Sequence, residues 1–198
     1  DKTVHALSVI IATGAGPRRL KVPGEEQYWG TGVTSCAVCD APFYKDEEVV
    51  VVGGGDSAVE EAIQLTPYAK KITILVRKGQ MRAASRMMDH LKSYNKIDVK
   101  YNVEVERILG DDSKVTGVEL RDATTGQTST FKTSGVFLAI GHIPNTNIFK
   151  DKVTLDADGY IVMAKGRSQQ TSVPGVYAAG DVEDREYRQA HRRGGDCG

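Results

Sequence analysis

The feature that most constrains the fold of this chain is a valine run that ends in a glycine turn. Residues 48–52 read Glu-Val-Val-Val-Val, and Gly53-Gly54-Gly55 follows at once. An unbroken apolar run of this length is typical of a central strand in a parallel sheet that is covered on both faces. Since residues 72–76 read Ile-Thr-Ile-Leu-Val, the next strand is expected there, and the fold class is α/β.

A helix is expected between these strands, from about Asp56 until Pro67 closes it. Its apolar stripe consists of Ala58, Val59, Ala62, Ile63 and Leu65, and its polar side of Glu60, Glu61 and Gln64. The strand–helix–strand unit is therefore complete.

The glycine turn also has the spacing of a dinucleotide-binding site, Gly53-x-Gly55-x-x-Ala58. In such a site the first glycine makes a tight turn, the second lets the backbone approach a pyrophosphate, and a small third residue keeps helix and strand close. Asp56 and Ser57 would begin the helix, whose first N–H groups face the phosphates. The pattern alone also fits an ordinary glycine turn, but its place between a strand and a helix favours dinucleotide binding.

Basic residues follow the second strand, where the choice between dinucleotides is made. An NAD site has an acid there for the ribose hydroxyls, but this chain has Arg77 and Lys78, with Arg82 one turn later. These cations would pair with the 2′-phosphate of NADPH. The alternative is a solvated basic strand end, and NADPH is the preferred interpretation.

Outside this unit the chain alternates between short strands and turns. A buried strand is expected over residues 7–12, a crossing between domains over 16–25, and a helix from Ala83 to Tyr94. An antiparallel meander is expected over residues 97–133, where apolar residues recur with period two. A last parallel strand at 135–139, a second crossing at 141–145, a hairpin at 156–160 and a strand at 176–180 complete the pattern.

Composition excludes several classes of function. Among 198 residues, 26 basic and 26 acidic side chains cancel, so no nucleic-acid or membrane partner is indicated. No apolar run has the length of a membrane span. The N-terminal residues do not resemble a signal peptide, and Asp1 is interpreted as a cut end. Three cysteines do not form a secreted disulfide scaffold, which favours a reducing, cytoplasmic location.

Cys36 and Cys39 are spaced as half of a zinc site, an inert pair or a redox couple. Zinc needs two further ligands, and the histidines show no ligand spacing. Two cysteines three apart can close a reducible ring, and Asp40 could pass a proton to a departing thiolate. A nicotinamide delivers a hydride whereas a disulfide is reduced through thiolates, so a flavin is expected between them.

These motifs together resemble the low-molecular-weight thioredoxin reductases, up to about Ala190. The matching stretches are Ala12-Thr13-Gly14, Cys36-Ala37-Val38-Cys39-Asp40, residues 53–60, the Arg77/Lys78/Arg82 cluster, Ala139-Ile140-Gly141-His142-x-Pro144-Asn145-Thr146, residues 175–182 and Tyr187-Arg188-Gln189-Ala190. The resemblance implies a three-layer, Rossmann-like fold of the two-dinucleotide-binding flavoproteins: an NADPH domain at residues 21–146 with a β-meander insertion, between FAD-domain segments at 1–20 and 147–198.

The resemblance also implies an activity and site residues. NADPH would reduce FAD, FAD would reduce the Cys36–Cys39 disulfide, and the resulting dithiol would reduce oxidised thioredoxin. In this scheme Cys39 would face the flavin, Cys36 would attack the partner disulfide, and Asp40 would be the general acid. The NADPH residues would be Gly53, Gly55, Asp56, Ser57, Ala58, Arg77, Lys78, Arg82, Ile140 and Gly141, and the FAD residues Thr13, Gly14, Gly180, Asp181, Arg188, Gln189 and Ala190. The family is homodimeric and rotates its NADPH domain between two arrangements.

The chain departs from the family pattern in several places. Val76 and Met81 replace a histidine and an aromatic residue, and Ala41 replaces a glycine, while the tail 191–198, with Cys197, does not match. The first half of the FAD domain is missing, so the chain is expected to bind NADPH but to hold FAD poorly. The alternatives are an alkyl hydroperoxide reductase flavoprotein, which prefers NADH, and a catalytically incompetent NADPH-binding fragment.

Overall fold

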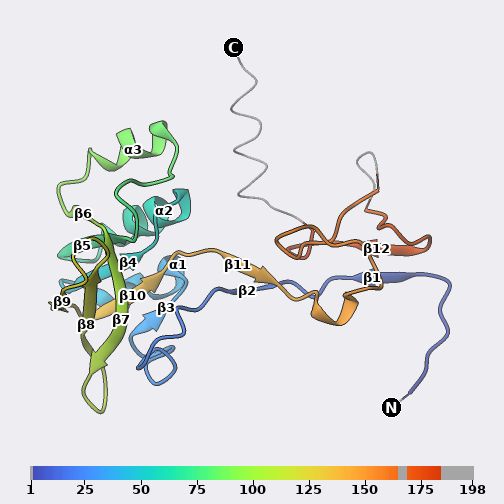
Figure 1. Cartoon of the computed structure of the whole chain (residues 1–198), viewed down its shortest axis with the longest axis horizontal. Coiled ribbons are helices and arrows are strands. Elements are labelled where there is room, and N and C mark those ends of the chain that lie inside the picture. The colour runs from blue at the N-terminus through green and yellow to red at the C-terminus, as the bar shows by residue number, and fades with distance from the viewer. Residues whose placement is uncertain (1, 165–168, 184–198) are drawn as a thin grey trace. The chain divides into compact units, whose positions relative to one another are not determined.

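The structure, a computed structural model, describes residues 2–164 and 169–183 (Figure 1). The chain forms two compact units. The large unit is Pro17–Gly141, and the small unit combines Asp1–Gly16 with His142–Gly198. The division into FAD-domain and NADPH-domain segments at residues 20 and 146 stays a prediction.

A five-stranded parallel sheet forms the centre of the large unit, in the order β3-β10-β4-β5-β6. These strands are Val33–Thr34, Gly135–Leu138, Glu48–Val52, Lys71–Val76 and Ile97–Tyr101. The valine run is a central strand, as predicted, since β4 pairs in parallel with β10 on one side and β5 on the other. Val50 and Val51 are fully buried.

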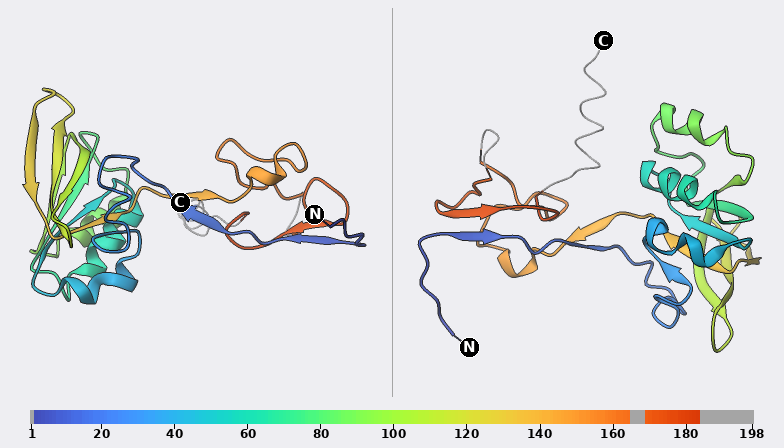
Figure 2. Two further views of the ribbon diagram at one scale, coloured as in Figure 1. Left: turned by 90° about the horizontal axis from the view of Figure 1, so that it is seen from below. Right: turned by 180° about the vertical axis from the view of Figure 1, so that it is seen from behind.

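The large unit has three layers, because alternate side chains of the central strands point to opposite faces. Val49 and Val51 pack in one core with α1 (Ala37–Asp40), α2 (Asp56–Leu65) and α3 (Ser85–Leu91). Val50 and Val52 pack in a second core with an antiparallel sheet (Figure 2). That sheet consists of β7 (Val103–Gly110), β8 (Val115–Asp122) and β9 (Thr128–Lys132).

Two predictions for the large unit need correction. The meander begins at Val103 and not at residue 97, because β6 pairs in parallel with β5. As the edge strand, β6 packs only Ile97 and Val99 against the helix-side core, so it shows the same period-two pattern as an antiparallel strand. The helix predicted from Ala83 to Tyr94 is limited to α3, since Ala84 has an extended conformation (φ −59°, ψ 146°).

The small unit has little regular structure among its described residues. Its strands β1 (Val9–Ile11) and β12 (Val176–Ala178) pair in parallel, and the hairpin predicted at 156–160 is present as a turn closed by a Leu155–Ile161 bridge. The core here consists of Ile11, Val153, Ile161, Ala178 and Val182. The buried strand predicted at 7–12 is wrong in its burial, because Val9 and Ile10 are exposed and β1 pairs only with β12 in the described part of the chain.

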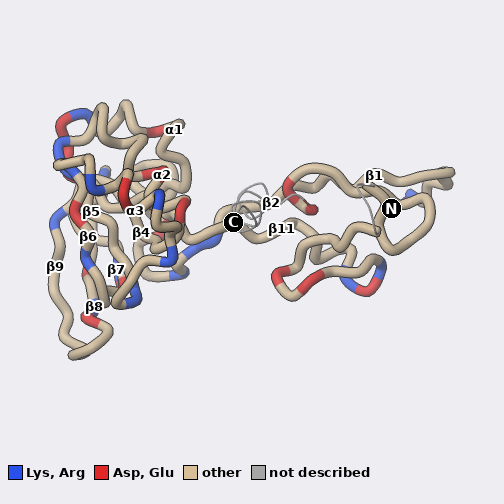
Figure 3. Tube along the Cα trace, turned by 90° about the horizontal axis from the view of Figure 1, so that it is seen from above, with Lys and Arg blue, Asp and Glu red and all other residues tan. Residues whose placement is uncertain are grey.

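Two short strands that pair with each other, β2 (Ala15–Pro17) and β11 (His142–Pro144), overlap the predicted crossings at 16–25 and 141–145, whose role as crossings between domains stays a prediction. Short 3-10 helices, η1 (Ala41–Tyr44) and η2 (Asn147–Phe149), complete the structure. No helix in the described ranges has the length and apolarity needed to cross a bilayer. Basic and acidic residues are interspersed along the trace (Figure 3).

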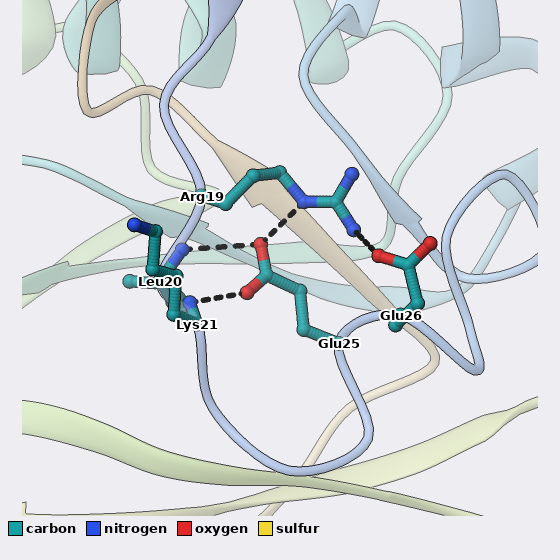
Figure 4. A network of polar contacts seen from close by, with 5 residues as sticks. All are labelled: Arg19, Leu20, Lys21, Glu25 and Glu26. Atoms are coloured by element: carbon teal, nitrogen blue, oxygen red, sulfur yellow. Dashed lines mark hydrogen bonds and ion pairs between the residues drawn. The ribbon is translucent and has the colours of Figure 1, made fainter.

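A buried carboxylate fixes the segment that follows the first crossing. Glu25 is only 2% exposed, and its carboxylate accepts hydrogen bonds from Arg19 Nε (2.8 Å) and from the backbone N–H groups of Leu20 (3.1 Å) and Lys21 (2.5 Å) (Figure 4). The Arg19 guanidinium also lies 3.5 Å from the centre of the Trp29 ring. This network satisfies the buried charge of Glu25.

Candidate functional site

Cys36 and Cys39 form a disulfide at the start of α1. The N–H of Cys36 donates to Thr34 Oγ1 at 3.2 Å, and the N–H of Cys39 donates to Cys36 Sγ at 3.2 Å. Within the described residues, no group of three or more His, Cys, Asp or Glu side chains could hold a metal ion. The arrangement is that of a two-electron couple, and the zinc alternative has no further ligands in the described part of the chain.

Two exposed apolar side chains lie close in sequence to this disulfide, on α1 and η1 of the large unit. Val38, between the cysteines, is 71% exposed, and Phe43 on η1 is 80% exposed. A hollow of about 300 Å³ lies alongside, lined by residues 30–34 and by Asp40, Phe43 and Tyr44. Burial raises the pKa of the Tyr44 hydroxyl, and the nearby charge of Asp40 raises it further.

Glu61 is a functional candidate that the sequence analysis placed on the polar side of its helix. In the structure its carboxylate is half-buried and accepts the N–H of Ala37 at 2.6 Å, so α2 is joined directly to α1. Burial raises the pKa of Glu61, while the Ala37 hydrogen bond lowers it and the charge of Glu60 raises it. The helical pattern alone could not show this contact, because α1 approaches α2 only in the tertiary fold.

The glycine turn lies between β4 and α2, where it was predicted. A Cβ atom on Gly53 would lie 2.4 Å from the Ala139 carbonyl oxygen and 3.0 Å from the Cβ of Ala58, so only glycine fits there. A Cβ on Gly55 would meet nothing within 4 Å. Ala58 is fully buried. The turn therefore has a tightly packed first glycine and an open second one, as a phosphate cradle requires.

The predicted NADPH residues lie at one edge of the parallel sheet. Asp56 and Ser57 follow the carboxyl end of β4, Arg77 and Lys78 that of β5, and Ile140 and Gly141 that of β10. Since β10, β4 and β5 are neighbours in the sheet, these ends lie side by side.

Arg82 is held near the glycine turn by the backbone. Its N–H donates to the Gly54 carbonyl at 2.6 Å, and Asp56 Oδ1 accepts the N–H of Ala84 at 2.8 Å. The Arg77 side chain is 72% exposed, with Nε 3.8 Å from Glu104 Oε1. The structure therefore brings a basic loop to the glycine turn and leaves the Arg77 guanidinium accessible.

Four of the predicted FAD residues lie at one edge of the small unit. Thr13 and Gly14 follow β1, and Gly180 and Asp181 follow β12, its parallel partner. Gly14 and Gly180 have positive φ angles, of 69° and 77°, and open space where a Cβ would be. Arg188, Gln189 and Ala190 lie outside the described residues.

Comparison with known proteins places these features in a family. The family model described as pyridine nucleotide-disulphide oxidoreductase matches residues 1–194. The chain is 48% identical to a thioredoxin reductase of Mycolicibacterium smegmatis over 190 residues, which are 96% of this chain and 60% of that protein. It is 47% identical to a thioredoxin reductase of Neurospora crassa over 186 residues, 92% of this chain and 55% of that protein.

Solved structures give the same result. The crystal structure of T. acidophilum thioredoxin reductase matches with a TM-score of 0.81 and 42% identity, over 93% of this chain and 60% of that chain. The chain therefore spans between about half and two thirds of the length of these relatives, at 55% and 60%.

Proposed function

Since this chain belongs to the pyridine nucleotide-disulphide oxidoreductase family, we propose that it supplies the NADPH-binding and dithiol parts of a thioredoxin-disulfide reductase. The observation that supports this most is the union of two sites in the large unit. Helix α2 begins at the glycine turn of Gly53 and Gly55, and its residue Glu61 accepts the N–H of Ala37, the residue that follows Cys36 of the disulfide. A nucleotide and a protein disulfide are the two substrates that such a unit would serve.

NADPH would bind along the carboxyl edge of the parallel sheet. The pyrophosphate would lie against Gly55, and the N–H groups of Asp56 and Ser57 at the start of α2 would donate to it. Arg77, Lys78 and Arg82 would pair with the 2′-phosphate, and Ile140 and Gly141 would contact the nicotinamide half. Ala58 would keep α2 close to β4.

FAD would lie against Thr13, Gly14, Gly180 and Asp181 of the small unit, since the two glycines have positive φ angles and open space where a Cβ would be. Together with Arg188, Gln189 and Ala190, these residues would hold FAD, which would supply two-electron chemistry between the nicotinamide and the disulfide. In the proposed reaction the disulfide takes up two electrons and two protons. Cys36 as a thiolate then attacks the disulfide of the partner. Asp40 accepts the proton of the sulfur that attacks and donates a proton to the sulfur that leaves.

Thioredoxin is the proposed partner because of the surface around the disulfide. Val38 and Phe43 present apolar area that a protein partner would remove from water, whereas a small disulfide would leave it exposed. A homodimeric assembly and a cytoplasmic location stay predictions.

Nucleotide binding tests the first part of this proposal. Gly55→Ala is expected to weaken NADPH binding at least tenfold without changing stability, because a methyl group there meets only the space reserved for phosphate. Gly16→Ala, outside the glycine turn, also meets open space at a position without a positive φ and is the matched control. Titration by fluorescence measures both, and unchanged binding in Gly55→Ala would remove the proposed cradle.

A second measurement tests the choice of nucleotide. The chain is expected to bind NADPH at least tenfold more tightly than NADH, and Arg77→Ala with Lys78→Ala should remove that preference while leaving NADH binding unchanged. Equal affinities in the unsubstituted chain would remove the argument for NADPH, and tighter binding of NADH would favour a reductase of the alkyl hydroperoxide type. For turnover, Cys39→Ser in the full reductase is expected to abolish thioredoxin reduction, and normal rates would contradict the role of the pair.

A further inference from the structure

One side chain links the nucleotide turn to the disulfide. Glu61 lies on α2, which begins at the glycine turn, and its carboxylate accepts the N–H of Ala37 at 2.6 Å. Ala37 is fully buried and directly follows Cys36. We propose that Glu61 is a positioning residue for Cys36 that holds the backbone beside the sulfur and makes the Cys36–Cys39 couple more strongly reducing.

The geometric part of this inference rests on the hydrogen bonds of the cysteine segment. The N–H of Cys36 donates to Thr34 Oγ1, and the N–H of Ala37 donates to Glu61 Oε2, so side-chain oxygens hold the amides on both sides of the Cys36 Cα. The amide of Ala37 is buried and would have no partner without Glu61. Glu61 therefore fixes the backbone from which the Cys36 sulfur projects.

The electrostatic part follows from the charge of the carboxylate. Reduction of the disulfide takes up two electrons and yields a thiolate and a thiol, or two thiols after a second proton is bound. A thiolate on Cys36 would form one residue away from an amide that already carries a carboxylate, and the like charge disfavours it. A less stable reduced form means a lower potential, that is, a stronger reductant.

Charged groups also lie on the elements that pack against α2, among them Glu48 on β4 and Lys71 on β5. Glu60 on α2 acts on Glu61 by like charge, and Asp40 on α1 acts on Tyr44 of η1. On α3, which also packs against α2, the ionisable groups are Arg86, Asp89 and His90, all exposed. Since burial raises the pKa of Glu61, its charge is lost earlier than that of an exposed glutamate as the pH falls.

The test uses the whole chain with Cys197→Ser in every variant, so that only two thiols titrate. The chain is equilibrated with reduced and oxidised dithiothreitol at mildly alkaline pH, and the dithiol fraction is measured by alkylation and mass spectrometry. Glu61→Gln keeps an oxygen for the Ala37 N–H but removes the charge. It is expected to shift the equilibrium toward the dithiol about tenfold, equal to about 30 mV, and to lower the thiol pKa of Cys36 by about one unit.

Two further variants separate charge from structure. Glu119→Gln on β8 is the matched control and should leave the equilibrium unchanged. Glu61→Ala should shift it as Glu61→Gln does and, in addition, speed alkylation of Cys36, because the amide beside the sulfur is released. The difference between Glu61→Gln and the unsubstituted chain should also disappear as the pH falls through the pKa of Glu61.

An equilibrium and a thiol pKa that are the same in Glu61→Gln as in the unsubstituted chain would overturn the inference. The inference deepens the proposed function, but this measurement needs no NADPH, FAD or thioredoxin. If the reductase assays fail but Glu61→Gln shifts the dithiol equilibrium as expected, only the proposed function is contradicted. If the reductase assays succeed but Glu61→Gln leaves the equilibrium unchanged, only this inference is contradicted.

Discussion

The two units of this chain differ most in how much apolar surface they bury. The large unit has two cores, one on each face of a five-stranded sheet, whereas the described residues of the small unit include five buried apolar ones around two strands. Most of the exposed large apolar side chains belong to the small unit: Val4, Leu7, Val9, Ile10, Ile143, Ile148, Val162 and Tyr177.

From this difference we expect the large unit to be stable by itself, and the small unit to gain little stability from its own core. A parallel sheet is normally covered on both faces and extended on both sides, but among the described residues β1 and β12 form a two-stranded sheet, joined otherwise only by an isolated bridge between Gln170 and Tyr177. The thioredoxin reductases that the chain resembles are longer than it is, at 55% and 60% coverage. The large unit should therefore carry the stability of this chain, and the small unit should add little to it.

Substitutions in the two cores test most directly whether the large unit alone carries the stability of the chain. Phe137→Ala in the large unit, where the side chain is fully buried, should lower the free energy of unfolding by about 3–5 kcal/mol. Ile161→Ala in the small unit should leave that transition unchanged. Urea unfolding followed by the fluorescence of Trp29, the single tryptophan and a residue of the large unit, measures both. Equal shifts would mean that the two units unfold together.

Glycines in the two units provide a second contrast. Gly53→Ala should destabilise the large unit by about 1–3 kcal/mol, because its Cβ would lie 2.4 Å from the Ala139 oxygen and the backbone must move. Gly14→Ala in the small unit meets no atom within 4 Å, and although its φ of 69° is strained for alanine, the Trp29 transition should not move. A shift with Gly14→Ala as large as with Gly53→Ala would contradict the separation.

The pH dependence of stability should also come from the large unit. Burial raises the pKa of Glu61 in the folded state, so the contribution of this group is present below its unfolded pKa and is lost as the pH rises through the folded pKa. Glu61→Gln should therefore become more stable relative to the unsubstituted chain between acidic and neutral pH. Parallel unfolding curves at several pH values measure this, and a constant difference across them would rule it out.

The smallest effect is expected in the turn between β8 and β9. The Asp122 carboxylate accepts the N–H groups of Thr124 and Thr125, which lowers its pKa. Its contribution is present above the unfolded pKa and is lost as the pH falls through the folded pKa. Asp122→Ala should thus destabilise the large unit slightly at neutral pH and not at all at strongly acidic pH. Asp112→Ala, in the β7–β8 turn, is the control.

Much of the large unit could be predicted from sequence, because its signals are local. The valine run, the glycine spacing and the stripe of α2 each lie within a few consecutive residues, and the structure shows each element where it was expected. The basic residues at the end of β5 were found for the same reason. The edge position of β6 was missed, since a strand with one covered face shows the same alternation in either sheet.

Contacts between distant segments could not be predicted in this way. The hydrogen bond from the Ala37 N–H to Glu61 depends on how α1 packs on α2. A glutamate that faces solvent at this helix position would have the same sequence pattern. The exposure of Val9 and Ile10 was missed for a related reason: an apolar run indicates that a strand prefers burial, but burial itself requires neighbours.

Helix α2 sets a limit on how this segment can change in length. Each residue of an α-helix turns the chain by about 100°. One residue inserted between Gly55 and Glu61 would leave the glycine turn intact but direct the glutamate to another side of the helix, away from Ala37. The number of residues between these two positions therefore determines which side of α2 Glu61 occupies. Natural or engineered variants should accept substitutions in this segment far more readily than insertions or deletions.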